Sequence, residues 1–378
     1  MTTPRVLCFQ QRLTHYRETF FQRAKEALAA KGIAFDLVYG QPDAVAQVRK
    51  DSGHLPWAHA VKETTLRLGE FTGVWLPTPT IIARPDLVIV TQENKLLANY
   101  VWLLRRMLGG PKVAYWGHGA NFQSDVPSGL RERWKQFLAP KVDWWFAYTQ
   151  MTVDILAKAG YPQQQVTNLN NAIDTGAFKA DLSAVADADL VATRQTLNIA
   201  PNALVGIFCG SLYPDKKLDF LVAACDRIHQ QSPEFHCLVL GDGPSMPTLC
   251  EAAATRPWLH LLGVTTGAQK ALYFRMAAFM LNPGLVGLHI VDAFCAGLVM
   301  VTTAGARHSP EVCYLRDSIN GVMTGDTEAD YAQRVVALIN DPVVLAKLRA
   351  ASLANADVYT LEKMVAHFAE GIEQCLGQ

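Results

Sequence analysis

The sequence lacks the features that mark several common protein classes. Its 34 basic and 34 acidic residues give a net charge of zero, which argues against a dedicated nucleic-acid-binding protein. Its eight cysteines include no CxxC pair, so we expect reduced core residues in a cytoplasmic protein rather than a disulfide framework. No apolar run reaches the length of about 18 residues that a transmembrane helix needs. The first residues also lack the pattern of a signal peptide.

The short motifs of several enzyme classes are absent too. The chain contains no GxSxG, P-loop or GxGxxG sequence, so a serine hydrolase, a P-loop NTPase and a dinucleotide oxidoreductase lack support. Asp187-Ala188-Asp189 is similar to a metal-binding DxD motif, but it lies in a polar stretch without further ligands. No His/Cys cluster has the spacing of a zinc site. We therefore predict no metal site.

Buried strands alternate with amphipathic helices along most of the chain, which is typical of a doubly wound α/β fold. The 378 residues exceed one ordinary core, and a polar stretch from Asn168 to Val185 is the candidate linker. We predict two tandem Rossmann-like domains facing a cleft, over residues 1–178 and 179–378. The last helix, at about residues 361–376, is expected to pack back on the first domain.

Some elements can be assigned closely from periodicity. Residues 18–30 and 217–229 are expected helices, and residues 236–240 an expected strand. In the first helix, four apolar residues recur at helical spacing and should face the core. They are Phe20, Phe21, Ala24 and Leu28.

The stretch from Met280 to Thr303 has the pattern of a βαβ unit whose helix begins near Gly287. His289 and Asp292 are three residues apart and share one face of this otherwise apolar helix. A loop that enters such a helix directs backbone N–H groups at the space above the strands, which suits a phosphate. The alternative is an ordinary core crossover, which would still need a partner for the two polar side chains.

A second candidate anion site is the loop from Gly210 to Lys217, between a buried strand and an amphipathic helix. Lys216 and Lys217 lie at the start of that helix, where the helix dipole repels cations. A bound anion would remove this conflict, because lysine and free N–H groups together form a phosphate clamp. The alternative is a solvated lysine pair on a surface turn, and it carries more weight for Lys217 than for Lys216.

His118 directly follows an expected strand and has a glycine on each side. Glycines let a ligand approach the backbone closely, although a structural histidine would fit the same pattern. Nearby, basic residues alternate with aromatic ones between Trp102 and Trp145. This pattern suits contact with an anionic bilayer, and ordinary helix surfaces with inward-packed tryptophans would look the same.

Several of these segments occur together, and in the same order, in family-4 retaining glycosyltransferases of the GT-B fold, which the chain resembles over nearly its whole length. The resemblance is strongest in the second half, in GSLYPDKKLD at 210–219, LGDGP at 240–244, LLGV at 261–264 and PGLVGLHIVDAFCAG at 283–297. NAID at 171–174, SPE at 309–311 and NG at 320–321 are similar to shorter motifs of the family.

The resemblance implies transfer of a sugar from a nucleotide diphosphate sugar to a glycan or lipid-linked acceptor, with retention at the anomeric carbon and no cofactor. The first domain would bind the acceptor and the second the nucleotide sugar. Lys216 would neutralise the leaving diphosphate, Asp292 would bind the ribose hydroxyls, and His118 would be the active-site histidine. The donor would be bound by Gly210, Ser211, Lys216, Lys217, Gly241, Gly284, Val286, Gly287, Leu288 and Asp292.

Three positions depart from the family pattern. Gly284 replaces the first acid of an acidic pair, so backbone N–H groups of residues 284–288 would have to substitute for its recognition of the sugar. Ser211 replaces the arginine that accompanies the phosphate lysine. The N-terminal loop at residues 10–17, usually glycine-rich, is QQRLTHYR. We expect this loop to bind an anionic acceptor through Arg12, His15, Tyr16 and Arg17.

The resemblance thus predicts a transferase that builds a cell-surface polysaccharide or glycolipid at the inner face of the membrane. Two alternatives stay open. A nucleotide-sugar 2-epimerase has tandem Rossmann domains of similar length, but it needs additional carboxylates that are not evident in the sequence. A catalytically silent glycosyltransferase-like partner protein would account for the missing acid and arginine. The presence of Lys216, Asp292 and His118 argues against it.

Overall fold

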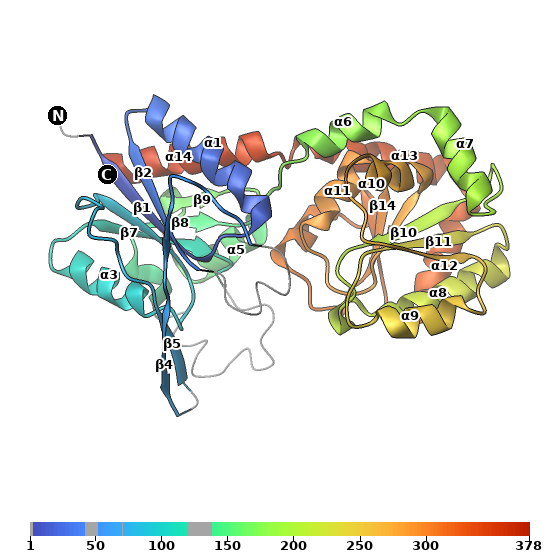
Figure 1. Ribbon diagram of the computed structural model, residues 1–378, viewed down its shortest axis with the longest axis horizontal. Helices are drawn as coiled ribbons and strands as arrows, with labels where there is room; N and C mark the ends of the chain where they lie inside the picture. Colours follow the sequence, from blue (N-terminus) through green and yellow to red (C-terminus); the bar gives the residue numbers. More distant parts are fainter. Residues whose placement is uncertain (1–2, 42–51, 70, 120–137) are drawn as a thin grey trace. The chain divides into compact units, whose positions relative to one another are not determined.

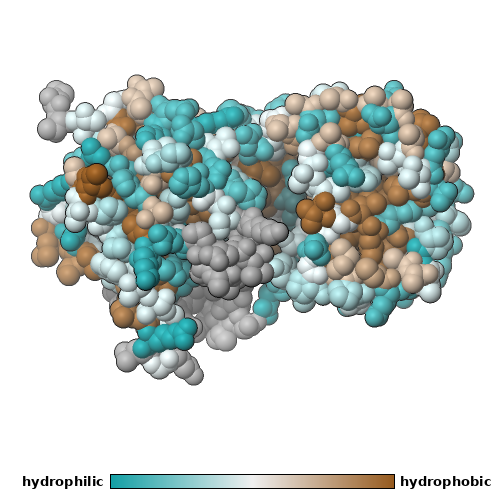
Figure 2. Space-filling model, viewed as in Figure 1, coloured by the Kyte–Doolittle hydropathy of each residue, from teal (hydrophilic) through white to brown (hydrophobic). Residues whose placement is uncertain are grey.

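The computed structural model describes residues 3–41, 52–69, 71–119 and 138–378 and divides into two compact units (Figure 1). The first unit comprises Met1–Asp174 and Thr360–Gln378, and the second comprises Thr175–Tyr359. None of the helices in these described ranges combines the length and the apolar composition needed to cross a membrane. On the face shown in Figure 2, hydrophilic and hydrophobic residues are mixed over both units.

The first unit is built on a seven-stranded sheet with the order β3-β2-β1-β6-β7-β8-β9. All its neighbouring strands are parallel. The order reverses between β1 and β6, which makes the ends of these strands the expected ligand-binding edge. The strands are β1 (Arg5–Arg12), β2 (Ala34–Gly40), β3 (His59–Val61), β6 (Leu87–Thr91), β7 (Lys112–Gly117), β8 (Trp144–Ala147) and β9 (Val166–Asn168), and a separate antiparallel pair is β4 (Thr64–Leu68) and β5 (Phe71–Trp75).

The helices of the first unit cover this sheet. Within the described part of this unit, the α-helices are α1 (Glu18–Ala30), α3 (Leu97–Met107), α5 (Gln150–Lys158) and α14 (Leu361–Gly377). The four apolar residues of α1 expected to face inward are all buried. The C-terminal helix α14 packs beside α1 (Figure 1), and the ring of Phe368 lies 5.3 Å from that of Phe20. The last residues of the chain therefore belong to the core of the first unit.

The second unit is built on a six-stranded sheet with the order β12-β11-β10-β13-β14-β15. Its neighbouring strands are also all parallel. Here the order reverses between β10 and β13, so ligands are expected beyond the carboxyl ends of these two strands. The strands are β10 (Val205–Cys209), β11 (His236–Leu240), β12 (Leu259–Gly263), β13 (Phe279–Leu281), β14 (Val299–Thr303) and β15 (Gly321–Thr324).

Helices connect the strands of the second unit in the manner of a doubly wound fold. They are α6 (Gly176–Ala184), α7 (Asp187–Thr196), α8 (Leu218–Gln231), α9 (Met246–Ala253), α10 (Gly267–Met276), α11 (His289–Cys295), α12 (Glu328–Ile339) and α13 (Pro342–Ala354). The α/β class with two Rossmann-like sheets is as predicted from the sequence.

Three local predictions have different outcomes. The boundary between the two units, between Asp174 and Thr175, lies within the expected linker from Asn168 to Val185. The second half of that stretch is the helix α6, which was not predicted and which buries Phe178 and Leu182. The sequence pattern also predicts a helix around residues 130–138, most of which lies outside the described residues. The DxD-like sequence forms the first turn of α7, where carboxylates interact favourably with the helix dipole.

Candidate functional site

The loops that follow β10 and β13 meet at the point where the sheet order of the second unit reverses. The backbone N–H of Leu285 donates to the carbonyl of Asp215 at 3.0 Å. In return, Lys216 Nζ donates to the carbonyl of Leu285 at 2.6 Å, and Asn282 Nδ2 donates to the same oxygen at 3.0 Å. These bonds lock together two loops that are about seventy residues apart in the sequence.

Gly284 lies where these two loops come closest. A Cβ added there would be 2.3 Å from the carbonyl oxygen of Asp215 and 2.6 Å from Cα of Lys216. Both neighbours are backbone atoms and cannot swing away as a side chain could. This arrangement of the loops leaves no room for any side chain at residue 284. The close contact therefore explains why a glycine replaces the first acid of the family's acidic pair.

Glycines also allow a third loop to approach. A Cβ at Gly241, directly after β11, would lie 1.9 Å from the carbonyl oxygen of Gly210. Gly210 and Gly241 have φ of 154° and 135°, in the region that favours glycine. Backbone bonds from Gly210 to Leu240 and from Leu212 to Asp242 hold the loops together. The loop after β10 is thus fixed on both sides by backbone contacts.

Lys216 and Lys217 have different environments. Lys216 ends a short 3-10 helix, and burial lowers its pKa from the ordinary 10.5 to about 8. Lys217 adopts a left-handed conformation with φ 52° and ψ 50°, and its Nζ lies 5.9 Å from the centre of the Phe220 ring. Both side chains are half-buried, and Lys216 is the one whose ammonium group joins the two loops. Ser211, at the position of the family's arginine, is exposed.

Asp292 lies on α11 and is only 8% exposed. Its Oδ2 accepts a hydrogen bond from Lys270 Nζ at 2.8 Å. Lys270 belongs to α10, and its ammonium group lies 4.4 Å from the centre of the Phe178 ring. Burial works against the charge of Lys270, but the Asp292 carboxylate outweighs it, so the net pKa of Lys270 is raised.

Sequence reasoning missed Lys270, although a signal was present. Lys270 is the fourth residue of α10, and a lysine in the first turn of a helix conflicts with the helix dipole. The same conflict was used to select Lys216. Cys209, at the end of β10, interacts electrostatically with Lys270, Asp292 and Lys216. Two lysines and one carboxylate thus lie around the end of β10.

Two histidines complete this cluster. Burial and then the nearby Lys216 and Lys270 lower the pKa of His289 well below 6.5, so its imidazole is neutral near pH 7. Among the described residues His289 Nε2 has no hydrogen-bond partner. His308 accepts from the N–H of Val286 at 3.2 Å and contacts the carbonyl of Thr303 at 2.8 Å, which assigns the proton of His308 to Nε2.

In the first unit, His118 follows β7, and its ring stacks on Tyr148 with the centroids 4.3 Å apart. Arg12, His15 and Tyr16 are exposed. Arg17 is half-buried and donates to Asn171 Oδ1 at 2.5 Å. The side chain of Arg17 thereby fixes the segment after β9, whereas its three neighbours face solvent.

In the described ranges, no three His, Cys, Asp or Glu side chains are grouped so that they could hold a metal ion. The chemistry that the cluster around β10 offers is instead that of two ammonium groups, a carboxylate and a neutral imidazole.

Residues 203–341, which include the whole cluster, match the protein family described as Glycosyl transferases group 1. Alpha-monoglucosyldiacylglycerol synthase of Acholeplasma laidlawii is 23% identical over 175 residues, which are 45% of this chain and 42% of that protein. D-inositol 3-phosphate glycosyltransferase of Streptomyces bingchenggensis (strain BCW-1) is 25% identical over 195 residues, which are 47% of this chain and 42% of that protein. The matched region therefore spans less than half of either relative.

Among solved structures, the crystal structure of Anabaena Alr3699/HepE in complex with UDP is similar over 98% of this chain and 99% of that chain. Its TM-score is 0.67 and its sequence identity 17%. This likeness confirms the predicted GT-B-type fold with two Rossmann-like units. With the family match to the second unit, it also confirms the resemblance to group 1 glycosyltransferases.

Proposed function

We propose that the protein is a retaining glycosyltransferase that moves a sugar from a nucleotide diphosphate sugar to a glycan or glycolipid acceptor, in the synthesis of a cell-surface polysaccharide or glycolipid. The observation that carries the proposal is the half-buried Lys216 at the reversal point of the second sheet. Its ammonium group donates to the carbonyl of Leu285, and burial lowers its pKa despite the nearby Asp215, whereas a bound diphosphate would supply a full counter-charge. The UDP complex of Alr3699/HepE, which has the same fold, supports a nucleotide donor.

On the donor side, Lys216 would stabilise the negative charge that develops on the leaving diphosphate. Asp292 would accept hydrogen bonds from the ribose hydroxyls, with Lys270 holding its carboxylate in place. The remaining donor contacts would come from the backbone of residues 284–288, with Gly210, Ser211, Gly241 and Lys217 around the phosphates. The proposal includes no metal ion and no cofactor.

On the acceptor side, we assign His118 the role of stabilising charge near the reacting hydroxyl. Arg12, His15 and Tyr16, which are exposed, would bind an anionic group of the acceptor. Because Arg17 is bonded to Asn171, we propose that it mainly orders this loop. Replacing Arg12 and His15 together by alanine should raise acceptor KM; an unchanged KM would remove this part of the proposal.

A lipid-linked acceptor would be met at a membrane surface. The Acholeplasma relative is named for a diacylglycerol product, which supports this class of acceptor. At the end of α3, the side chains of Leu104, Met107 and Leu108 are 57%, 77% and 78% exposed, beside the exposed Arg105. Apolar residues next to a basic one suit the surface of an anionic bilayer, and we propose peripheral contact at the inner face of the membrane.

The donor site can be tested by thermal shift with UDP, GDP, dTDP and CMP. At about 100 times Kd, a ligand stabilises by about 2.7 kcal/mol, which is a shift of several degrees. We expect one diphosphate to stabilise the wild type and Lys347→Ala, a control at an exposed lysine of α13, but not Lys216→Ala. If no nucleotide stabilises the wild type, the chain is the silent partner protein instead. Release of free sugar from the donor without an acceptor, with an epimerised product, would indicate the epimerase.

A further inference from the structure

The segment at residues 284–288, which is proposed to contact the donor, is held from two sides. It follows β13, which lies between β10 and β14 in the sheet. From the β10 side, Leu285 is bonded through its N–H to Asp215 and through its carbonyl to Lys216. From the β14 side, the segment is held by the loop that follows β14, and this loop contains His308.

Val286, in the middle of the segment, is fixed by both of its backbone groups. Its N–H donates to His308 Nδ1 at 3.2 Å, and its carbonyl accepts from the N–H of Ser309 at 2.9 Å. Val286 is 0% exposed, so no water replaces His308 as the acceptor in this arrangement. A buried N–H that loses its acceptor is costly. The position of Val286 therefore depends on the imidazole ring of His308.

The ring of His308 is itself oriented by the end of β14. Its Nε2 lies 2.8 Å from the carbonyl oxygen of Thr303. Because a carbonyl oxygen only accepts, the ring proton is on Nε2 and Nδ1 is left as the acceptor for Val286. A second proton, on Nδ1, would direct one N–H group at another. The link from β14 to Val286 thus exists only while His308 is neutral.

The surroundings of His308 keep it neutral near pH 7. Burial lowers its pKa below 6.5, and Lys217 and Lys216, from the loop after β10, lower it further. The Thr303 carbonyl and Asp326, from the loop after β15, act in the opposite direction without reversing the shift. His289 on α11 is a further titratable neighbour, and it is also neutral near pH 7. The charges around His308 therefore favour the form that accepts from Val286.

We propose that His308 is a positioning residue of the donor site, whose neutral ring holds Val286 and thereby fixes the backbone of residues 284–288 for the nucleotide sugar. The N–H groups of Leu285 and Val286 already have protein acceptors. The donor would therefore contact other groups of the segment, and their direction depends on how Val286 is held. This inference rests on the proposed function, because it assigns the segment to the donor.

Hydrogen exchange in the protein without nucleotide tests the link directly. In His308→Asn the side-chain oxygen can take the place of Nδ1 but does not titrate, whereas His308→Ala removes the acceptor. Near pH 7, the protection factor of peptides covering residues 284–288 should fall about tenfold in His308→Ala, as for the loss of one hydrogen bond, and stay near that of the wild type in His308→Asn. At about pH 4.5 the wild type should lose the same protection, and His308→Asn should not.

The affinity for UDP or GDP, measured near pH 7 on the same variants, tests the functional part. We expect about tenfold weaker binding by His308→Ala and nearly unchanged binding by His308→Asn. The matched control is His229→Ala, which removes a half-buried histidine of the same unit that contacts the carbonyl of Phe235 at 3.1 Å. This control should change neither the exchange of residues 284–288 nor the affinity.

The outcomes that would contradict the inference are distinct from those that would contradict the proposed function. Equal protection of residues 284–288 in the wild type and His308→Ala would overturn the inference, as would a loss of protection that left nucleotide affinity unchanged. An equal loss in His229→Ala would show a general loss of stability and would also overturn it. If the wild type bound no nucleotide but showed the expected exchange, the donor function would be refuted, while His308 would still order the segment. If His308→Ala did not fold, the wild type and His308→Asn at the two pH values would provide the same comparison.

Discussion

In the first unit the sheet order reverses between β1 and β6, and in the second between β10 and β13. The second reversal point carries charged groups, with Lys270 bonded to the buried Asp292 and Lys216 to a carbonyl group. The first carries Gln92, an uncharged amide with no partner among the described residues. Two sheets of like topology therefore offer different chemistry at the same place, because the side chains and loops, not the fold, determine the ligand.

The polar groups at the two reversal points also differ in whether they have hydrogen-bond partners. In the second unit, the charged groups have partners within the protein, so a ligand must replace or add to existing bonds. In the first unit, the buried Gln92 amide has none among the described residues. Substitutions that remove each polar group while keeping its bulk should therefore have opposite effects on stability.

The largest effect is expected for Lys270→Met. Removing one member of a buried ion pair leaves the other charge without compensation and costs about 3 kcal/mol or more. Asp292 would be that uncompensated charge, since its side chain is only 11% exposed. We expect a marked fall in the urea midpoint of the second unit, followed by circular dichroism and tryptophan fluorescence.

The double variant Lys270→Met/Asp292→Leu provides the control. An apolar pair of similar volume can replace a buried ion pair at little cost, so the double variant should recover most of the lost stability while failing to bind nucleotide. If the double variant were less stable than Lys270→Met alone, the ion pair would not be the source of the loss.

Gly284→Ala should produce the next largest effect. The added Cβ would meet backbone atoms of residues 215 and 216 within 2.6 Å, and such overpacking costs about 1–3 kcal/mol. Gly287→Ala is a matched control three residues away, because a Cβ there has no neighbour closer than 3.7 Å. Thermal unfolding with and without UDP or GDP should show losses of stability and nucleotide response for residue 284 only. Equal effects at both positions would mean that the close loop contact is not what requires the glycine.

Much of the fold could be predicted from periodicity. The bounds of α1 and β11 agree with those expected, and α8 begins and ends within two residues of its prediction. These elements have apolar faces that local sequence reveals. The helix α6 was not predicted because it is only nine residues long and rich in Gly, Ala and Ser, so its local sequence shows little helical periodicity.

The candidate site was less accessible to sequence reasoning. Lys216 was selected because a lysine at a helix start is unusual, and Asp292 because an acid in an apolar helix needs a partner. The partner, Lys270, is twenty-two residues away, and only the folded chain brings the two together. Gln92 was not found, because a glutamine after a strand is common and its burial without partners is a property of the tertiary structure.

A third prediction concerns pH and has a moderate effect. Because the pKa of Lys216 is lowered from 10.5 to about 8, the protein must take up a proton to present a charged Lys216 above about pH 8. Diphosphate affinity should therefore fall up to about tenfold per pH unit above that value. The stability of the free protein changes with pH in the opposite direction. Between about pH 8 and pH 10.5 the unfolded chain binds more protons than the folded one, so the free energy of unfolding rises with pH.

The thermal shift caused by UDP or GDP, measured from about pH 7 to about pH 9.5, tests this prediction. In Lys216→Arg the charge persists over the whole range, so any remaining diphosphate stabilisation should not depend on pH there. A parallel decline in the arginine variant would assign the pH dependence to another group.

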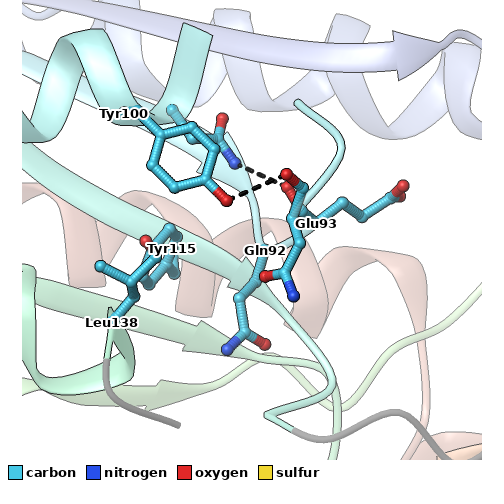
Figure 3. Close-up of a pocket in the computed structure, with 7 residues that line it drawn as sticks. Gln92, Glu93, Tyr100, Tyr115 and Leu138 are labelled. Atoms are coloured by element: carbon cyan, nitrogen blue, oxygen red, sulfur yellow. Dashed lines mark hydrogen bonds between the residues drawn. The ribbon is translucent and has the colours of Figure 1, made fainter. Parts of the chain in front are cut away.

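The smallest effect is expected for Gln92→Met, where stability should be unchanged or higher by up to about 1 kcal/mol, because the substitution removes a buried amide that makes no hydrogen bonds. Asn99→Leu is the informative contrast. Asn99 lines one small hollow together with Gln92 (Figure 3) and is 5% exposed. Its amide, however, donates to the carbonyl of Thr91, so the loss of this amide should lower the free energy of unfolding by about 1–3 kcal/mol. Urea unfolding of both variants measures the difference. A clear loss of stability in Gln92→Met would mean that its amide is satisfied within the free protein, and the contrast between the two reversal points would then disappear.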